Sequence, residues 1–202
     1  MRKCVLAAMA ALALLLGPAT AHATTTTETL VFMRHGEKPS GGYGELTCQG
    51  LQRSLQLPDV LIGRYGKAKW AYAPNPSAKI SDPAGSFYYV RPLATIEPAV
   101  IRLGISVNTS VAYYDVSSLN SLLLRSTKAA DTIYIAWEHA YLVAAVQAIM
   151  NKYGGGYAVP AWQTGDYDSL YVVHVTWTDG VITSAHFQHD YEGLNNLSTS
   201  CP

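Results

Sequence analysis

Short runs of β-forming residues alternate with helical patterns along this sequence, and this alternation restricts the possible fold more than any other feature. The run "TLVFM" at 29–33 is apolar almost throughout, as a strand covered on both faces is. The stretch "TIYIAWEHAYLVAAVQAIMNKYGGG" at 132–156 begins with β-branched residues, continues as a helix and ends at glycines. The pattern predicts an α/β domain, a three-layer sandwich with a mostly parallel central sheet flanked by helices.

Further elements follow from the residues that start and stop them. Thr47 is a good N-cap and predicts a helix that begins there and that Pro58 interrupts. Strands are expected at 68–72 and 106–114, each rich in β-forming residues. Between them, "PNPSAKISDPAGS" at 74–86 has the composition of a surface loop.

Two more elements complete the expected order. A helix should follow Arg91, with Pro98 marking either a kink or a new start. Near the C-terminus, "LYVVHVTWTDGVITSAHF" at 170–187 predicts a β-hairpin, because Asp179-Gly180 between two β-rich runs suits a tight primed turn.

The first 23 residues have the composition of a secretory signal peptide. Arg2 and Lys3 precede the apolar run "CVLAAMAALALLL", and "AHA" at 21–23 supplies the small residues that a signal peptidase reads. An uncleaved membrane anchor is the alternative, although the run is short and rich in alanine for a membrane span. We therefore expect an exported protein, periplasmic or secreted, with a signal peptide at 1–23 and a single domain at 24–202.

Charge excludes some partners of the expected mature chain. Without Arg2 and Lys3 it holds 12 basic and 14 acidic residues, a net charge of −2. We expect no nucleic-acid partner and, after signal cleavage, no membrane partner. Attraction for an anionic ligand must therefore come from a few well-placed arginines. The oligomeric state stays open.

Two cysteines remain after the signal peptide. In an oxidising exported compartment, Cys48 and Cys201 can close one disulfide that ties the C-terminal tail to the segment after the first strand. Two unpaired thiols are the alternative, and no Cys-x-x-Cys pair suggests metal or redox chemistry.

The chemistry begins just after the first strand, with Arg34, His35 and Gly36. In an open α/β sheet, ligands bind at the carboxyl ends of the strands. There an arginine can clamp phosphate oxygens, and a glycine lets the backbone approach closely. A histidine can present a neutral ring nitrogen as a nucleophile toward phosphorus.

Two later residues extend this group. His139 follows the strand at 132–137 just as a helix begins, so it has the same place on its strand as His35 has on the first. Arg91 opens a helix and adds a second guanidinium. Two histidines at corresponding strand ends can converge on one ligand, and Arg91 would add its guanidinium to the same pocket.

Four segments that carry these residues resemble the histidine phosphatase superfamily, the phosphoglycerate-mutase-like proteins. "MRHGEK" resembles the Arg-His-Gly signature, and "LTCQGLQRS" is similar to the helix start that follows it. "RPLATIEPAV" resembles the Arg-x-x-x-Thr segment with the second arginine, and "TIYIAWEHAYL" the late strand with the second histidine. The four occur in the family's order and lie within residues 28 to 150.

The resemblance implies a site and a mechanism. His35 would attack the phosphoryl group and become a phosphohistidine, which water then hydrolyses. Arg34, Arg91 and His139 would bind the three non-bridging oxygens, so neither a metal nor another cofactor is required. The expected function is a metal-independent phosphatase that acts on a small phosphorylated substrate.

A general acid must also protonate the leaving oxygen. Glu138, adjacent to His139, is the preferred candidate, and Asp115 is the second. Neighbouring strand residues point to opposite faces, so Glu138 reaches the pocket only if the strand has already ended.

The insertion, defined here as residues 74–90, departs from the family pattern, which has a short gap before the second arginine. It is interpreted as a surface excursion, and the alternative is a wall of the pocket with Tyr88 and Tyr89 as aromatic contacts. Two other functions stay open: a mutase of the same fold, which needs closing segments that this short chain lacks room for, and a phosphate-ligand binding protein without turnover.

Overall fold

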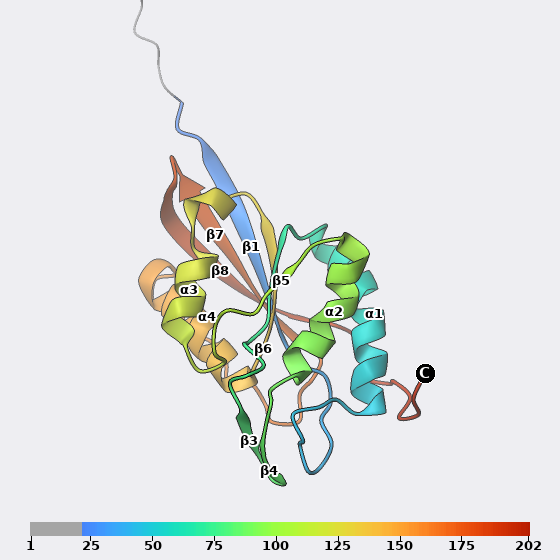
Figure 1. Cartoon of the computed structure of the whole chain (residues 1–202). Coiled ribbons are helices and arrows are strands. Elements are labelled where there is room, and N and C mark those ends of the chain that lie inside the picture. Colours follow the sequence, from blue (N-terminus) through green and yellow to red (C-terminus); the bar gives the residue numbers. More distant parts are fainter. Residues whose placement is uncertain (1–21) are drawn as a thin grey trace, which may run out of the picture.

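Six strands form one central sheet in the computed structural model, which describes residues 22–202 (Figure 1). Their order across the sheet is β5-β2-β6-β1-β7-β8. The first four of these are mutually parallel, whereas β7 is antiparallel to β1 and to β8. The strands are β1 (Thr25–Arg34), β2 (Trp70–Tyr72), β5 (Val107–Asn108), β6 (Thr132–Trp137), β7 (Ser169–Thr178) and β8 (Val181–Tyr191).

Helices cover both faces of this sheet, so the predicted α/β sandwich is confirmed (Figure 1). The helices α1 (Cys48–Tyr65) and α2 (Arg91–Leu103) pack on one face, and α3 (Val116–Leu123) and α4 (His139–Tyr153) on the other. The expected signal peptide at 1–23 lies almost entirely outside the described residues. No helix within residues 22–202 is long and apolar enough to cross a membrane.

Strand β1 shows why its sequence is apolar at successive positions. Leu30 and Phe32 point into the core beneath α3 and α4, whereas Val31 and Met33 point into the core beneath α1 and α2. Side chains alternate along a strand, so a strand between two helical layers must be apolar on both faces.

The interpretation of Pro58 as an interruption was wrong, because α1 continues through it to Tyr65. Of the two interpretations of Pro98, the new start is wrong, because Pro98 lies inside the continuous helix α2. Each proline removes one backbone donor. In α1 the buried face compensates for this loss, since Leu57, Pro58 and Leu61 are all buried.

The segment between β2 and α3 also departs from expectation. The predicted surface loop at 74–86 contains a small antiparallel sheet, β3 (Ile80–Asp82) and β4 (Gly85–Phe87), which lies beyond the end of the main sheet where β1 finishes (Figure 1). The strand expected at 106–114 is only β5. It ends there because Asn108 Oδ1 accepts a hydrogen bond from Ser110 N at 3.0 Å and turns the chain.

The C-terminal hairpin of β7 and β8 is confirmed. Asp179 and Gly180 both have positive φ, 51° and 77°, as a type I′ turn requires.

Cys48 and Cys201 form a disulfide, with Cα atoms 4.5 Å apart. It joins the C-terminal tail to the first turn of α1. Their separation of 153 residues makes the constraint on the unfolded chain large.

Replacing both cysteines with serine is expected to lower the free energy of unfolding by about 2–4 kcal/mol, because the unfolded chain regains the entropy of that loop. Urea unfolding of the oxidised protein and of the variant measures the difference. Reduced wild-type protein is the control, and its midpoint of urea unfolding should equal that of the variant. Equal midpoints for the oxidised protein and the variant would contradict the prediction.

Candidate active site

The predicted site residues come together at the carboxyl ends of β1 and β6. The two strands are paired in parallel with Arg34 opposite Trp137, so His35 and Glu138 follow at the same level. His35 N donates a hydrogen bond to Trp137 O at 3.3 Å. The start of α2 is joined to this edge, since Thr95 Oγ1 accepts from Gly36 N at 2.9 Å and donates to Arg91 O at 2.8 Å.

The loop after β1 is pressed against α1, and this fixes where His35 lies. A Cβ atom on Gly36 would lie 3.0 Å from Gly50 Cα, and one on Gly50 would lie 2.6 Å from Glu37 O. Glycine at both positions therefore allows the two backbones to touch. Thr47 N, just before the helix, donates to Glu37 O at 2.8 Å and closes the same contact.

His35 is oriented as a nucleophile. Its Nδ1 lies 2.7 Å from Gly36 O, and because a carbonyl oxygen only accepts, Nδ1 carries the proton and Nε2 keeps its lone pair. The ring is 2% exposed and lies between the rings of Tyr89 and Tyr167, with centroid distances of 6.0 and 6.1 Å. Burial, above all, and then the positive charge of Arg91 lower the pKa of His35 well below its ordinary value, with smaller effects from Arg34 and His139.

The His35 imidazole is therefore expected to stay neutral as the pH falls from about 7.5 to about 5.5, because its lowered pKa lies below the ordinary histidine value near 6.5. Long-range ¹H–¹⁵N NMR spectra of the rings report both tautomer and charge, and the spectrum of His35→Gln assigns the signal. We expect a proton on Nδ1 and constant shifts over this range. A ring that titrates near 6.5, or carries its proton on Nε2, would contradict the assignment.

Arg34 is held by the segment before β7. Its Nη1 donates to Thr164 O at 2.6 Å and to Asp166 O at 2.9 Å, and its guanidinium carbon lies 4.2 Å from the centre of the Tyr167 ring. The carboxylate of Asp166 accepts from Ser169 Oγ at 2.5 Å and fixes this segment at the start of β7. None of these three contacts of Arg34 was anticipated from the sequence.

Arg91 is held by the insertion, which contradicts its interpretation as a surface excursion. Asp82, at the end of β3, accepts from Arg91 Nη1 at 2.7 Å and from Nη2 at 3.3 Å, and both side chains are buried. Tyr89 is fully buried beside His35, whereas Tyr88 is exposed. The composition of the insertion could not predict this role, because a hairpin rich in proline and glycine has the same composition whether it faces solvent or a site.

The Asp82 carboxylate offsets the Arg91 charge. Burial acts to raise the pKa of Asp82, but the hydrogen bonds from Arg91 and Gly44 N outweigh it, so this pKa lies below its usual value. Lys38 Nζ lies 3.4 Å from the same carboxylate. Asp82 therefore stays ionised and fixes the orientation of the guanidinium.

Several buried polar atoms at this site have no hydrogen-bond partner among residues 22–202. They include Arg34 Nε, Arg91 Nε and the Tyr89 hydroxyl, three of the seven such side-chain atoms in this part of the chain. A buried donor without a partner costs about 1–3 kcal/mol. Their concentration around His35 indicates a place for a ligand that accepts hydrogen bonds, such as an anion.

Glu138 is the N-cap of α4, so the strand has ended before it, as its proposed role requires. Its Oε2 accepts from Ala140 N at 2.8 Å and from Tyr141 N at 3.0 Å, and its Oε1 lies 2.6 Å from His139 Nδ1. Burial acts to raise the pKa of Glu138, but the contact with His139 and the two amides outweigh it and the pKa is lowered. The negative charge of Glu138 also acts to raise the pKa of Arg34 and the pKa of Tyr89.

Asp115 is also an N-cap, of α3. Its Oδ1 accepts from Ser118 N at 3.0 Å and from Ser117 Oγ at 3.1 Å, and the bonds from Ser118 lower its pKa. Both candidate acids are therefore stabilised in their ionised form in the free protein. Only Glu138 adjoins His139.

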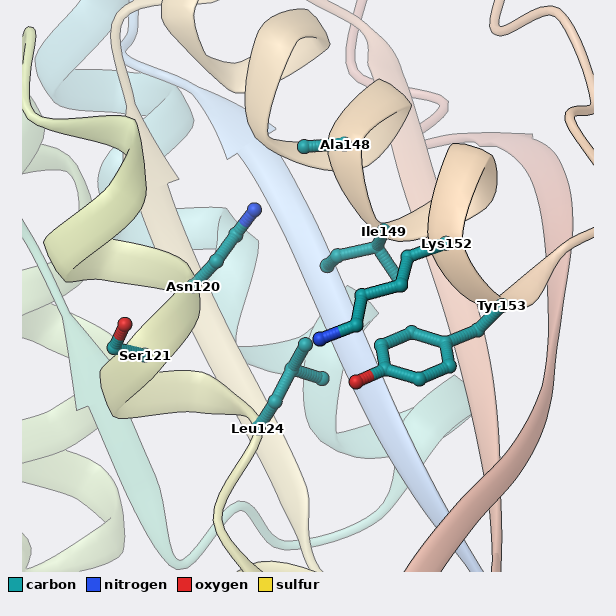
Figure 2. A pocket seen from close by; sticks show the side chains of 7 residues that line it. All are labelled: Asn120, Ser121, Leu124, Ala148, Ile149, Lys152 and Tyr153. Carbon is teal, nitrogen blue, oxygen red and sulfur yellow. The ribbon is translucent and has the colours of Figure 1, made fainter.

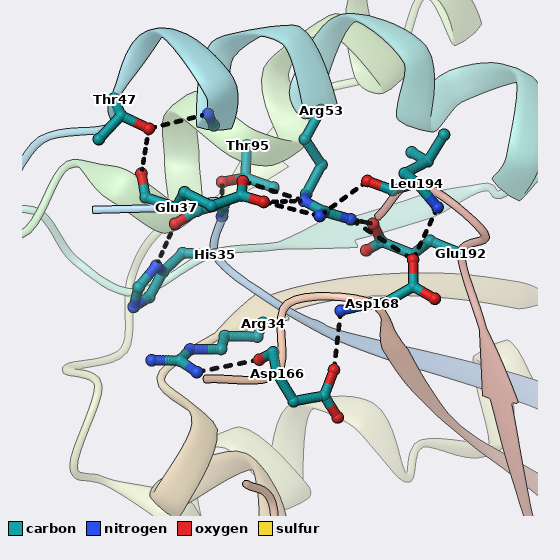
Figure 3. A network of polar contacts seen from close by, with 12 residues as sticks. Arg34, His35, Glu37, Thr47, Arg53, Thr95, Asp166, Asp168, Glu192 and Leu194 are labelled. Atoms are coloured by element: carbon teal, nitrogen blue, oxygen red, sulfur yellow. Dashed lines mark hydrogen bonds and ion pairs between the residues drawn. The ribbon is translucent and has the colours of Figure 1, made fainter. Parts of the chain in front are cut away.

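A buried ion network joins the loop after β1, through Glu37, to α1 (Figure 3). Arg53 in α1 is 1% exposed, and its Nη2 donates to Glu37 Oε1 at 2.7 Å. Its Nη1 lies 2.5 Å from Glu192 Oε2 and 3.7 Å from Asp168 Oδ1. One feature of the sequence could have predicted this role. Arg53 lies on the same helix face as Leu57, four residues later, and a residue on that face is expected to be buried.

Another pocket lies away from this site. It measures about 440 Å³ and lies between α3 and the second half of α4 (Figure 2). Ile149 is ten residues beyond His139 in α4, about 15 Å along the helix axis. This pocket is therefore separate from the His35 site. Its lining comprises Asn120, Ser121, Leu124, Ala148, Ile149, Lys152 and Tyr153.

Within residues 22–202, no three histidine, cysteine or acidic side chains are grouped as a metal site.

No protein-family model and no curated protein matches the sequence. Solved structures do match. A proposed phosphohistidine phosphatase, SixA from Nakamurella multipartitia, has a TM-score of 0.57 at 14% identity, over 81% of this chain and 95% of that one. The protein histidine phosphatase SixA in complex with tungstate has a TM-score of 0.56 at 13% identity, over 81% and 97%.

A phosphoserine phosphatase variant from Entamoeba histolytica, in complex with phosphoserine, has a TM-score of 0.50 at 13% identity, over 85% of this chain and all of that one. The chain therefore has the fold of these phosphatases, and the fold that the resemblance of the four segments implied is confirmed.

Proposed function

We propose that this protein is an exported, metal-independent phosphatase that hydrolyses a phosphomonoester through a phosphohistidine on His35. The observation that carries the proposal is the orientation of His35, whose Nε2 lone pair is free on a neutral ring among Arg34, Arg91 and His139. The proteins of this fold described above include phosphatases, which supports the same reaction class. Export rests on the signal-peptide pattern of residues 1–23 alone.

The first step forms a bond from His35 Nε2 to phosphorus and breaks the bond from phosphorus to the leaving oxygen. Arg34, Arg91 and His139 would bind the three non-bridging oxygens, over which the transition-state charge spreads. Water then attacks the phosphohistidine and releases inorganic phosphate, and His35 becomes neutral again. Fixed cationic donors in a buried site supply the electrostatic stabilisation that a metal provides elsewhere.

Glu138 is the proposed proton donor. Its carboxyl is ionised in the free protein, but a dianionic phosphoryl group nearby disfavours that charge and raises its pKa. Substrate binding would thus supply Glu138 with the proton that the leaving oxygen takes. Asp115 remains the alternative donor.

The test is to assay purified protein with 4-nitrophenyl phosphate and with phosphoglycerates, with and without a chelator. The proposal predicts release of inorganic phosphate from 4-nitrophenyl phosphate, at a rate that the chelator leaves unchanged. Transfer between phosphoglycerates without release would favour the mutase, and binding without turnover would favour a phosphate-ligand binding protein. Loss of activity with the chelator would contradict metal independence.

A further inference from the structure

A second, smaller pocket adjoins the proposed phosphoryl site. It measures about 290 Å³ and is lined by His139, Ala140, Val143, Ala161 and Trp162. His139 therefore belongs both to this pocket and to the group of residues around His35. The other four lining residues come from the first turns of α4 and from the segment that follows it.

The far wall of this pocket is tied to the phosphate-binding arginine. Trp162 Nε1 donates to Asp166 O at 2.9 Å, and the same carbonyl oxygen accepts from Arg34 Nη1 at 2.9 Å. The Trp162 ring also packs on Tyr171, with centroids 4.6 Å apart. The indole is thus fixed relative to the arginine, so the pocket is formed before a ligand binds.

The residues that line this pocket are mostly apolar. Apart from His139 it is apolar, and no lysine or arginine is among the described residues that line it. Glu138, which adjoins it, carries a negative charge. A second anionic group on a substrate would lose its water here without gaining a counter-charge. An apolar ring would instead be favoured, and cavities of about 150 Å³ already hold benzene.

We propose that this pocket binds the leaving group and that the substrates are phosphomonoesters of phenols or other apolar alcohols. The inference rests on the proposed function for the position of the phosphoryl group. It excludes substrates whose alcohol carries a carboxylate, such as phosphoglycerates. Ala161 and Val143 become specificity-determining residues.

The test measures binding, so that it does not depend on turnover. Phenylphosphonate and methylphosphonate are titrated into wild-type protein by calorimetry. Phenylphosphonate should bind at least about tenfold more tightly, because only its ring occupies the apolar pocket. Ala161→Trp fills the pocket from its exposed rim and should remove this preference while methylphosphonate binding stays within about twofold.

Ala158→Trp is the matched control, since Ala158 is exposed in the same segment but does not line the pocket. It should keep the full preference for phenylphosphonate. Val143→Asp, which places a charge in the pocket, should lower phenylphosphonate affinity as Ala161→Trp does. Equal affinity of the two phosphonates for the wild type, or an equal loss of both in Ala161→Trp, would overturn the inference. Selective binding without hydrolysis of phenyl phosphate would retain the pocket and refute the proposed function.

Discussion

His35→Ala is expected to lower kcat for 4-nitrophenyl phosphate by about 10⁴- to 10⁶-fold, because the variant has no atom to form the covalent intermediate. In the native protein Nε2 is the free nitrogen of a buried neutral ring, whereas the other imidazole of the site, His139, contacts Glu138 through Nδ1. Steady-state kinetics measures the effect, with circular dichroism to verify the fold.

His186→Ala is the matched control for this variant. His186 is exposed on β8, remote in sequence from the site residues, and its removal should leave kcat within about twofold. Retention of more than about a tenth of wild-type kcat in His35→Ala would exclude His35 as the nucleophile. A parallel loss in both variants would indicate a defect of folding instead.

Arg53→Met is expected to lower the free energy of unfolding by about 3–5 kcal/mol at about pH 8 and above, because it leaves buried carboxylates without their counter-charge. Arg53 lies within 4 Å of Glu37, Glu192 and Asp168, and the Arg53 and Glu192 side chains are 1% and 0% exposed. Burial raises the pKa of Glu192 to about 8, although the Arg53 charge acts in the opposite direction.

The loss in Arg53→Met should shrink as the pH falls. A carboxyl with a raised pKa binds a proton in the folded state before it does so in the unfolded state, so below about 8 acidification stabilises the fold through Glu192. In the variant, the loss of the Arg53 charge raises the pKa of Glu192 further. Acidification therefore adds more to the free energy of unfolding of the variant than to that of the wild type. Urea unfolding at about pH 8 and about pH 5.5 should therefore show a smaller deficit at the lower pH.

The control for Arg53→Met is Arg102→Met, which removes an exposed ion pair with Asp59. Such pairs contribute at most about 1 kcal/mol, so its unfolding curve should stay close to that of the wild type. A deficit in Arg53→Met no larger than in Arg102→Met would contradict the role assigned to the buried network.

The strand pattern predicted the fold, and the position of the candidate site residues at one sheet edge, because both depend on local signals. The alternation of β1 and β6 with helices places the residues after both strands at the same sheet edge, and the register pairs Arg34 with Trp137, so that His35 and Glu138 follow at the same level. The N-cap at Thr47 and the tight turn at Asp179-Gly180 were predictable for the same reason.

The partners of these residues were not predictable, because they depend on contacts between distant segments. Asp82 and Tyr89 reach the site only through the fold of the insertion, and Tyr167 only through the path of the chain between α4 and β7. No periodicity encodes those contacts. The interpretation of Pro58 failed for a related reason, since tertiary packing stabilises a helix that its local sequence would break.

The central claim is that His35 carries the phosphoryl group during turnover. The most direct measurement mixes the protein rapidly with a ³²P-labelled aryl phosphate, quenches in alkali, where the phosphorus–nitrogen bond survives, and locates the label by peptide mapping. The account predicts transient labelling of His35 at a rate that matches or exceeds turnover. Label on another residue, or steady hydrolysis with no labelled protein at any time and at any substrate concentration, would contradict it.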